Sequence, residues 1–287
     1  MFQPDLLTNK IACVTGGGSG LGLTMAKRFA ELGARVAILG RSAERLAEGA
    51  KAISAAGNGR EVTTVACDVR EYAAVAQAFD EIEQKLGVPD ILVNNAAGNF
   101  LAATEELSSG GFDAVMKIVM YGTFNCTQAL GKKWIAAQRP GSILNIVTTY
   151  AWTGSAFVLP SACAKAGVLA LTRSLAVEWA AYGIRVNAIA PGPFPTEGAW
   201  KRLIPSKELE DKARQRIPSG RFGEHEELAN LAVFLVADGA RFITGECVTI
   251  DGAEALAGAG QFSQFIQMDR NQLKGFLRMM KPKHKSA

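Results

Sequence analysis

The sequence has few of the residues that build metal centres and disulfide frameworks. It contains only two histidines, His225 and His284, and five widely spaced cysteines without a Cys-x-x-Cys pair. Two distant histidines cannot anchor a histidine-based metal site, so we expect no metal. An odd number of scattered cysteines gives no disulfide framework and is typical of a protein from a reducing compartment.

Membrane and export signals are also missing. The amino-terminal MFQPDLLTNK has no basic start followed by an apolar core, which a secretory signal requires. Residues 140–164 carry no charge, but Asn145, Thr148 and Pro160 are among the residues that interrupt the run. We therefore expect a cytoplasmic protein with no membrane span.

Excess positive charge is absent from most of the chain. The formal net charge is +4, yet the segment from Asp269 to the end carries six Lys or Arg and one Asp, which gives +5. The other 268 of the 287 residues therefore sum to −1. The basic balance belongs to a tail, about residues 258–287, and not to a groove, so we expect no nucleic-acid partner. A solvated helix or an oligomer contact is our interpretation of this tail, and contact with an anionic partner or membrane surface is the alternative.

Short β-branched runs alternate with longer helical patterns along the whole chain. The strand runs are residues 11–15, 35–39, 61–67, 91–95, 142–148, 185–190 and 246–250, and the helical runs are 21–32, 43–55, 72–86, 112–138, 162–181 and 224–237. This alternation predicts an α/β fold, a single doubly wound Rossmann domain over residues 1–287 with a mostly parallel seven-stranded sheet. Most strand runs are continuously apolar, as expected for strands buried on both faces.

One irregular stretch separates the sixth strand from the last helix. Prolines 193, 195, 205 and 218 punctuate an insertion at about residues 193–222. Long insertions beside the carboxyl end of a sheet are often substrate lids, so we expect a substrate loop here.

A glycine-rich segment follows the first strand. It consists of Gly16, Gly17, Gly18, Ser19, Gly20, Leu21 and Gly22, and it opens a helix. Glycine lets the backbone approach a pyrophosphate, and the helix N-terminus directs N–H groups at the phosphates. The strand-to-helix context makes this a predicted dinucleotide site rather than a flexible loop.

The second strand indicates which dinucleotide is bound. It ends in Arg41 and Ser42, where an NAD site usually has an acid. A guanidinium suits the 2′-phosphate of NADPH, although a surface arginine at a strand end is the alternative. Asp68, after the third strand, is placed to bind the adenine amino group.

These motifs, with Asn94-Asn95-Ala96-Ala97-Gly98 after the fourth strand and Pro191-Gly192 after the sixth, resemble the short-chain dehydrogenase/reductases from Leu7 to about Gly252. The resemblance implies a homotetramer packed through the helical runs 112–138 and 162–181. It also implies further cofactor contacts from Asn95, Lys165, Pro191, Gly192, Pro193 and Phe194.

One departure from that family concerns its Tyr-x-x-x-Lys motif. Lys165 is present, but Ser161 stands four positions before it, Thr148 takes the usual upstream serine position, and Tyr121 replaces the helix asparagine. A serine hydroxyl is a far poorer proton donor than a phenol. The usual ketone-reducing mechanism is therefore disfavoured.

The remaining residues resemble the 2,4-dienoyl-CoA reductases, which carry Ser-x-x-x-Lys and a tyrosine on the loop after the fifth strand. By this resemblance, Tyr150 and Asn99 donate hydrogen bonds to the thioester oxygen, Ser161 orients, and Lys165 holds the nicotinamide ribose. The implied substrate contacts are Arg70, Phe100, Ser108 and Arg202. The implied activity is NADPH-dependent reduction of dienoyl-CoA to enoyl-CoA in unsaturated fatty acid β-oxidation, with an acyl-CoA as substrate. Another short-chain reductase acting on a ketone or activated alkene, and a non-catalytic NADP-binding protein, remain as alternatives.

Overall fold

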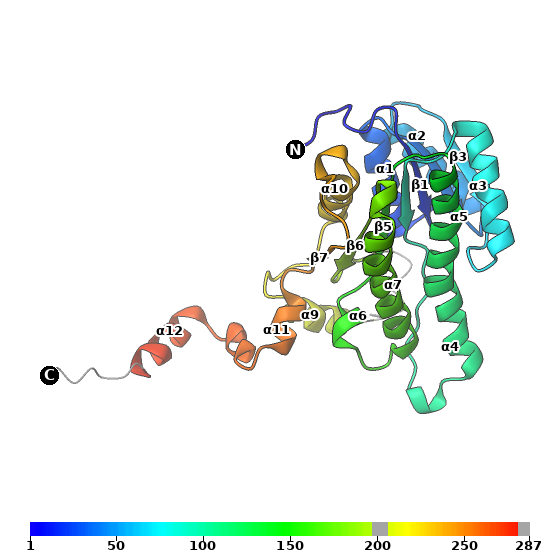
Figure 1. Cartoon of the computed structure of the whole chain (residues 1–287). Coiled ribbons are helices and arrows are strands. Elements are labelled where there is room, and N and C mark those ends of the chain that lie inside the picture. Colours follow the sequence, from blue (N-terminus) through cyan, green and yellow to red (C-terminus); the bar gives the residue numbers. More distant parts are fainter. Residues whose placement is uncertain (197–205, 281–287) are drawn as a thin grey trace.

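The computed structural model describes residues 1–196 and 206–280 and places seven strands in one sheet (Figure 1). The strand order is β3-β2-β1-β4-β5-β6-β7, and every pairing is parallel. The strands are β1 (Ile11–Thr15), β2 (Arg35–Gly40), β3 (Val62–Ala66), β4 (Ile91–Asn94), β5 (Gly141–Ile146), β6 (Ile184–Pro191) and β7 (Cys247–Ile250). The predicted α/β class with a doubly wound seven-stranded sheet is confirmed, and the sheet is wholly parallel.

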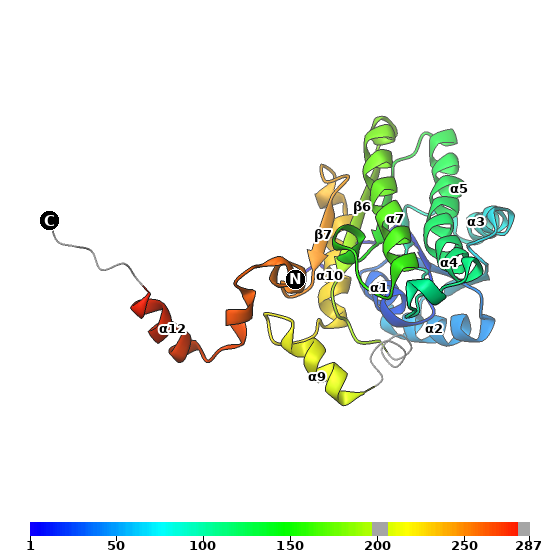
Figure 2. The ribbon, with the colours of Figure 1, turned by 90° about the horizontal axis from the view of Figure 1, so that it is seen from below.

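Helices cover both faces of the sheet. In the view from below, α3 (Tyr72–Leu86), α5 (Gly122–Ala136) and α7 (Leu159–Glu178) lie toward the top, while α1 (Gly20–Glu31), α2 (Ala43–Ala56) and α10 (His225–Val236) lie toward the bottom (Figure 2). The helices of each group pack on one another, α1 on α2 and α10, and α5 on α3 and α7. Because both faces are covered, the central strands are buried throughout, as continuous apolar runs require.

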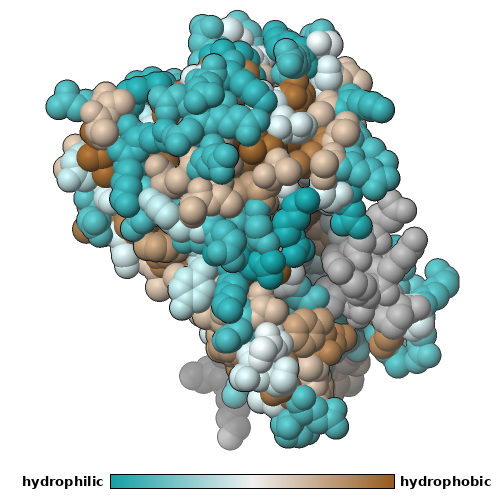
Figure 3. All heavy atoms as spheres, turned by 90° about the vertical axis from the view of Figure 1, so that its right-hand side faces the viewer, coloured by the Kyte–Doolittle hydropathy of each residue, from teal (hydrophilic) through white to brown (hydrophobic). Residues whose placement is uncertain are grey.

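Each face has its own apolar core. Met25 and Phe29 of α1 are fully buried between the sheet and α10, and Phe79 of α3 and Trp134 of α5 are fully buried on the opposite face. The indole Nε1 of Trp134 donates to the backbone oxygen of Pro89 at 2.6 Å, so this large side chain is buried without an unsatisfied donor. On the side that carries α3, hydrophilic side chains dominate the upper part of the surface, and apolar patches appear between and below them (Figure 3).

The predicted helical run 112–138 is divided in the structure. It begins earlier, as α4 (Ser109–Met116), because the Ser108 hydroxyl caps it by accepting the Gly111 N–H at 3.1 Å. A π-helical turn, Lys117–Tyr121, then joins α4 to α5. A π turn needs only one extra residue and leaves the apolar spacing almost unchanged, so sequence periodicity could not show it.

Two other boundaries differ from the prediction. The segment after β5 was expected to be a loop, but Tyr150–Thr153 forms the short helix α6. The following helix, α7, starts at Leu159 with Pro160 in its first turn, where a missing N–H is harmless, and ends at Glu178.

The carboxyl-terminal part leaves the body of the molecule as an arm. It contains α11 (Glu254–Ala259) and α12 (Arg270–Met279), and both ribbon views show α12 far from the sheet (Figures 1 and 2). Asp269 caps α12 by accepting the N–H groups of Asn271 and Gln272. In the predicted substrate loop, α9 (Lys207–Gln215) is helical. Within the described ranges, no helix is both long and apolar enough to cross a membrane.

Candidate active site

The glycine-rich segment forms the turn from β1 into α1. Gly16 and Gly20 have φ angles of +65° and +54°, which side-chain-bearing residues rarely adopt. A Cβ atom on Gly22 would lie 2.5 Å from the Gly16 oxygen, so the loop closes on the helix backbone without room for a side chain. The first turn of α1 carries no acidic residue, and Ser19 does not cap it with its side chain. Its N–H groups can therefore serve an anion.

Hydrogen bonds between Thr15 and the segment after β4 hold the glycine-rich loop in place. The Thr15 hydroxyl accepts the backbone N–H groups of Asn95 and Ala96, each at 3.0 Å. The Asn95 side-chain amide donates to the Thr15 carbonyl at 3.0 Å. Asn95, predicted as a cofactor contact, thus fixes the shape of the cradle that the cofactor would occupy.

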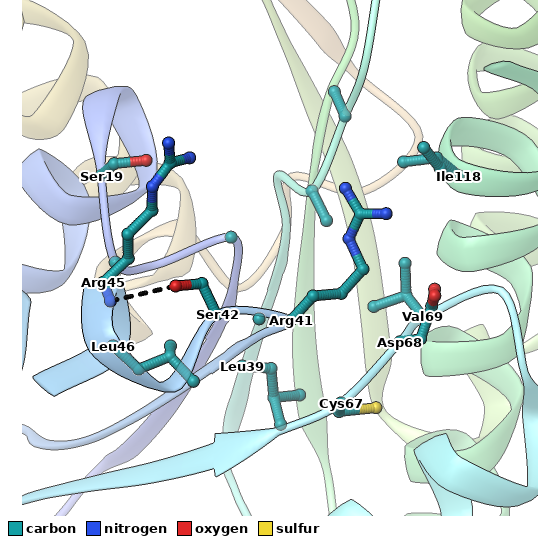
Figure 4. A pocket seen from close by; sticks show the side chains of 15 residues that line it. Ser19, Leu39, Arg41, Ser42, Arg45, Leu46, Cys67, Asp68, Val69 and Ile118 are labelled. Carbon is teal, nitrogen blue, oxygen red and sulfur yellow. Dashed lines mark hydrogen bonds between the residues drawn. The ribbon is translucent and has the colours of Figure 1, made fainter. Parts of the chain in front are cut away.

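A pocket opens between the glycine-rich loop and the end of β2 (Figure 4). Arg41 and Arg45 extend along its two sides, and Asp68 lies beyond Arg41. The Ser42 hydroxyl caps α2 by accepting the Arg45 N–H at 3.3 Å, and its own proton remains available to an acceptor in the pocket. The predicted residues Arg41, Ser42 and Asp68 are therefore brought together.

Asp68 and Arg70 form an ion pair at the edge of this pocket. The Arg70 Nε atom lies 2.9 Å from both Asp68 carboxylate oxygens, and Nη2 lies 2.5 Å from Oδ2. The hydrogen bond from the Arg70 side chain holds the pKa of Asp68 below its usual value. The predicted adenine contact and the predicted CoA contact are therefore partners of each other.

At the other end of the site, a phenol and a serine hydroxyl meet. Tyr150 begins α6, and its Oη atom lies 3.0 Å from the Oγ atom of Ser161 in α7. Ser161 is only 2% exposed and Tyr150 is half-buried, so this contact is partly shielded from solvent.

Lys165 lies one helical turn after Ser161. Its ammonium group is buried and donates to the backbone oxygen of Ile146. Burial lowers the pKa of Lys165 to about 8. Two residues after Ile146, the Thr148 Oγ1 atom is buried and has no hydrogen-bond partner in the described part of the chain. Such an atom normally requires a partner, which a bound ligand or water could supply.

Two of the predicted substrate residues, Phe100 and Ser108, lie around the start of α4, and Asn99 precedes Phe100. The Asn99 Oδ1 atom accepts the Phe100 N–H at 2.9 Å, which leaves the Asn99 amide as a donor. Phe100 is 38% exposed, and its ring approaches Gly111 in the first turn of α4, which Ser108 caps. Arg202 lies outside the described residues.

The segment after β6 is held by backbone contacts. Gly192 donates its N–H to Ile250 at 3.0 Å, and the Pro193 carbonyl accepts the Gly223 N–H at 3.1 Å. Phe194 is buried in the apolar core beside α10 and does not line the pocket at β2. Pro191 is the last residue of β6.

These features fit a nicotinamide dinucleotide. A Cβ atom on Gly22 has no room in the glycine-rich loop, Arg41 and Arg45 line the pocket at the end of β2, and the segment after β5 carries a buried Thr148 hydroxyl without a partner among the described residues. In the described ranges, no cluster of three or more His, Cys, Asp or Glu side chains is placed to hold a metal ion.

Comparison with known proteins agrees with this geometry. A family model described as enoyl-(acyl carrier protein) reductase matches residues 16–253. A probable 2,4-dienoyl-CoA reductase, (2E)-enoyl-CoA-producing, from Bacillus subtilis (strain 168) is 45% identical over 251 residues, which are 87% of this chain and 98% of the relative. The chain belongs to the short-chain dehydrogenase/reductase family. It is therefore an oxidoreductase of a family that uses a nicotinamide cofactor.

Solved structures of short-chain dehydrogenases have the same fold. A short chain dehydrogenase from Bacillus anthracis str. 'Ames Ancestor' superposes with a TM-score of 0.79 at 45% identity, covering 88% of this chain and 98% of that one. A gluconate 5-dehydrogenase from Burkholderia cenocepacia J2315, in complex with NADP and tartrate, gives a TM-score of 0.82 at 33% identity, with 88% and 98% covered.

The sequence patterns single out neither Arg45, which lines the pocket, nor His225, which supports the loop after β6. Arg45 lines the pocket at the end of β2, and the only sequence signal for it is a basic residue in the first turn of the helix after the second strand. His225 bridges the loop after β6 to α1, because its Nε2 lies 2.7 Å from the Pro195 oxygen and its Nδ1 lies 3.2 Å from the Thr24 hydroxyl. No local motif marks that residue.

Proposed function

We propose that this protein is an NADPH-dependent reductase of 2,4-dienoyl-CoA thioesters, which it converts to enoyl-CoA. The observation that carries the proposal is the 3.0 Å contact between Tyr150 Oη and Ser161 Oγ. Position 161 is where the Tyr-x-x-x-Lys motif would place its tyrosine. Here a phenol from α6 contacts the side chain at position 161, one helical turn before the retained Lys165. The name of the Bacillus subtilis relative supports this substrate class.

The proposed chemistry relies on stabilising negative charge at the substrate. NADPH, when bound, would supply the hydride that adds to the electron-poor end of the diene, and a proton from Tyr150 or from water then adds to a carbon of the chain to give the enoyl-CoA. Tyr150 and the amide of Asn99 donate hydrogen bonds to the thioester oxygen, where the charge develops. The Asn99 Oδ1 atom is already occupied by the Phe100 N–H, so its amide is oriented as a donor. Removing one such donor typically lowers the rate about 10²–10³-fold.

The cofactor would be held along the carboxyl ends of the strands. The glycine-rich loop and the start of α1 receive the pyrophosphate, Arg41 and the Ser42 hydroxyl receive the 2′-phosphate, and Lys165 holds the nicotinamide ribose. Thr148 Oγ1 is the buried polar atom that a bound ligand would satisfy. A role in unsaturated fatty acid β-oxidation and a homotetrameric assembly, both implied by family resemblance, complete the proposal.

The test is a reductase assay with the full-length protein. NADPH and 2,4-hexadienoyl-CoA are mixed, and loss of the dienoyl and NADPH absorbances is followed together. Crotonyl-CoA and simple ketones serve as alternative acceptors, and NADH serves as an alternative donor. We expect equal loss of both chromophores with the dienoyl-CoA. Turnover of ketones alone would indicate another short-chain reductase. Tight NADPH binding with no turnover of any acceptor would indicate a non-catalytic NADP-binding protein.

A further inference from the structure

We propose that the carboxyl-terminal arm binds the surface of a membrane that contains anionic lipids, with helix α12 lying in the plane of that surface. The arm, residues 254–280, contains α11, a 3₁₀ helix (Ser263–Gln267) and α12. This is a second binding function, and it does not rest on the proposed reductase activity. The arm attaches to one face of the membrane, since no described helix is long and apolar enough to cross it.

Helix α12 has an apolar face that the described part of the chain leaves largely uncovered. Leu273, Phe276, Leu277 and Met280 follow at intervals of three, one and three residues, so they share one side of the helix. Leu273 is buried, but Phe276, Leu277 and Met280 are 40%, 47% and 64% exposed. Both ribbon views show α12 far from the sheet (Figures 1 and 2). Apolar side chains gathered in this way mark a contact surface.

Aromatic contacts connect α12 to the rest of the arm. The rings of Phe262 and Phe265 stack with their centroids 6.3 Å apart, and the Phe265 ring lies 6.4 Å from the ring of Phe276 in α12. At the base of the arm, the Arg216 guanidinium lies 3.6 Å from the Glu254 carboxylate. The arm therefore presents its remaining apolar side chains outward from a packed aromatic cluster.

The charge of the arm indicates its partner. Arg270, Lys274 and Arg278 recur every four residues and form a stripe beside the apolar face. None of the three forms a salt bridge with a described carboxylate. The carboxylate of Asp269 is already used to cap α12. The positive stripe is therefore uncompensated within the described part of the chain.

An anionic lipid surface matches this stripe better than a second copy of the chain does. Residues 269–287 carry six Lys or Arg and one Asp, which gives +5, while residues 1–268 sum to −1. Another copy thus offers little net negative charge, whereas anionic headgroups offer a continuous negative surface. An apolar face bordered by basic side chains is the pattern of helices that lie in the membrane interface, where their apolar side enters the boundary between headgroups and acyl chains.

The arm starts at the edge of the sheet that holds the candidate site. Strand β7 ends at Ile250 and α11 begins at Glu254, so the arm leaves from the carboxyl ends of the parallel strands. The segments after β4 and β5 lie at the same edge and carry the exposed side chains of Leu101 and Trp152. Attachment through the arm would therefore keep the candidate site close to the membrane surface.

The experiment measures flotation of the full-length protein with lipid vesicles. One set of vesicles contains phosphatidylcholine alone, and the other contains phosphatidylcholine and phosphatidylglycerol in equal parts. We expect binding to the anionic vesicles and none to the neutral ones. Binding should weaken as the salt concentration rises, because salt screens the attraction between the basic stripe and the headgroups.

Two charge variants separate the arm from the total charge. Lys274→Gln/Arg278→Gln removes two positive charges from α12 and inserts good helix formers. It should weaken binding to the anionic vesicles about 30-fold, since each basic residue at such a surface contributes a factor of about five. Arg35→Gln/Lys51→Gln removes the same two residue types from exposed positions of β2 and α2, and it should leave the affinity unchanged.

An apolar variant tests whether the uncharged face enters the membrane. Leu277→Ser/Met280→Ser keeps every charge and changes only exposed positions, so the circular dichroism should remain that of the wild type. We expect it to lose most of the vesicle binding. Its oligomeric state without vesicles, measured by analytical ultracentrifugation, should equal that of the wild type.

Three results would overturn the inference. The first is a wild-type protein that does not float with the anionic vesicles. The second is an equal loss of binding in the two charge variants, because binding would then follow total charge and not the arm. The third is dissociation of an oligomer by Leu277→Ser/Met280→Ser, which would make the apolar face an interface between copies of the chain. The reductase assay contains no vesicles, so its outcome is independent of all three.

Discussion

The two ends of the candidate site are built by different means. At the cofactor end, backbone lies against backbone, since a Cβ on Gly22 would stand 2.5 Å from the Gly16 oxygen. At the reactive end, side chains meet across two helices, as in the contact between Tyr150 and Ser161. Backbone packing admits only glycine and leaves a fixed motif in the sequence. Where side chains pack, a different helix can supply the same chemical group. The Tyr-x-x-x-Lys motif can therefore lose its tyrosine while the phenol of Tyr150 contacts position 161 from α6.

Tyr150→Phe tests the reactive end and has the largest expected effect. If the phenol donates to the thioester oxygen, its removal should lower the dienoyl-CoA reductase rate about 10²–10³-fold, because an oxyanion donor is lost. NADPH binding should stay within twofold, measured by quenching of cofactor fluorescence. Tyr182→Phe removes an exposed phenol on the turn that follows α7 and serves as the control. Full activity in Tyr150→Phe would show that the hydroxyl takes no part in the reaction.

Gly22→Ala tests the cofactor end. The added methyl group would stand 2.5 Å from the Gly16 oxygen and 2.4 Å from the Asn95 amide nitrogen, and a backbone oxygen cannot move aside cheaply. Overpacking of this kind costs about 1–3 kcal/mol of folding free energy. Urea unfolding should show this loss, and NADPH affinity should fall as well.

The matched control for this change is Gly258→Ala. Gly258 lies in α11, and an added Cβ would meet nothing within 4 Å. The two variants carry the same chemical change in different surroundings. Equal stability of both would mean that the glycine-rich loop relaxes without penalty and that the backbone contact is not a constraint.

The same contrast explains what the sequence could predict. The seven-stranded parallel sheet and the meeting of Arg41, Ser42 and Asp68 follow from short local patterns, namely apolar strand runs and the residues directly after them. The pairing of Asp68 with Arg70 and the bridge made by His225 depend on rotamers and distant segments, which no local pattern encodes. The family resemblance, and not periodicity, pointed to Tyr150, whose short helix α6 was predicted as loop.

Lys165, one helical turn after Ser161 at the reactive end, gives a pH-dependent prediction. Burial lowers its pKa in the folded protein from 10.5 to about 8, so the folded protein releases this proton near pH 8 while the unfolded chain keeps it until about pH 10.5. Between those values the unfolded state binds more protons, and the stability contributed by this group therefore rises with pH by about 1 kcal/mol per pH unit.

Urea unfolding of the wild type and of Lys165→Met between pH 7.5 and pH 10 would measure this difference. Subtracting the variant removes the titration of every other group. We expect the difference in unfolding free energy to be flat at the acidic end and to grow in favour of the wild type above about pH 8. A difference that stays constant over the whole range would mean that Lys165 titrates as an exposed lysine.

Ser161→Ala has the smallest expected effect on the reductase rate. It tests whether Ser161 acts only by holding the phenol of Tyr150. Ser161 does not replace the tyrosine of the Tyr-x-x-x-Lys motif as an acid in the proposed scheme; it holds the Tyr150 hydroxyl at 3.0 Å. Loss of one neutral hydrogen bond costs about 0.5–1.5 kcal/mol, so the rate should fall about two- to tenfold. In the Tyr150→Phe background the same substitution should have no effect, because the partner hydroxyl is already gone. If the two rate losses instead multiply in the double variant, Ser161 acts on the substrate independently of Tyr150, and the reactive end then contains two separate donors and not one phenol held by a serine.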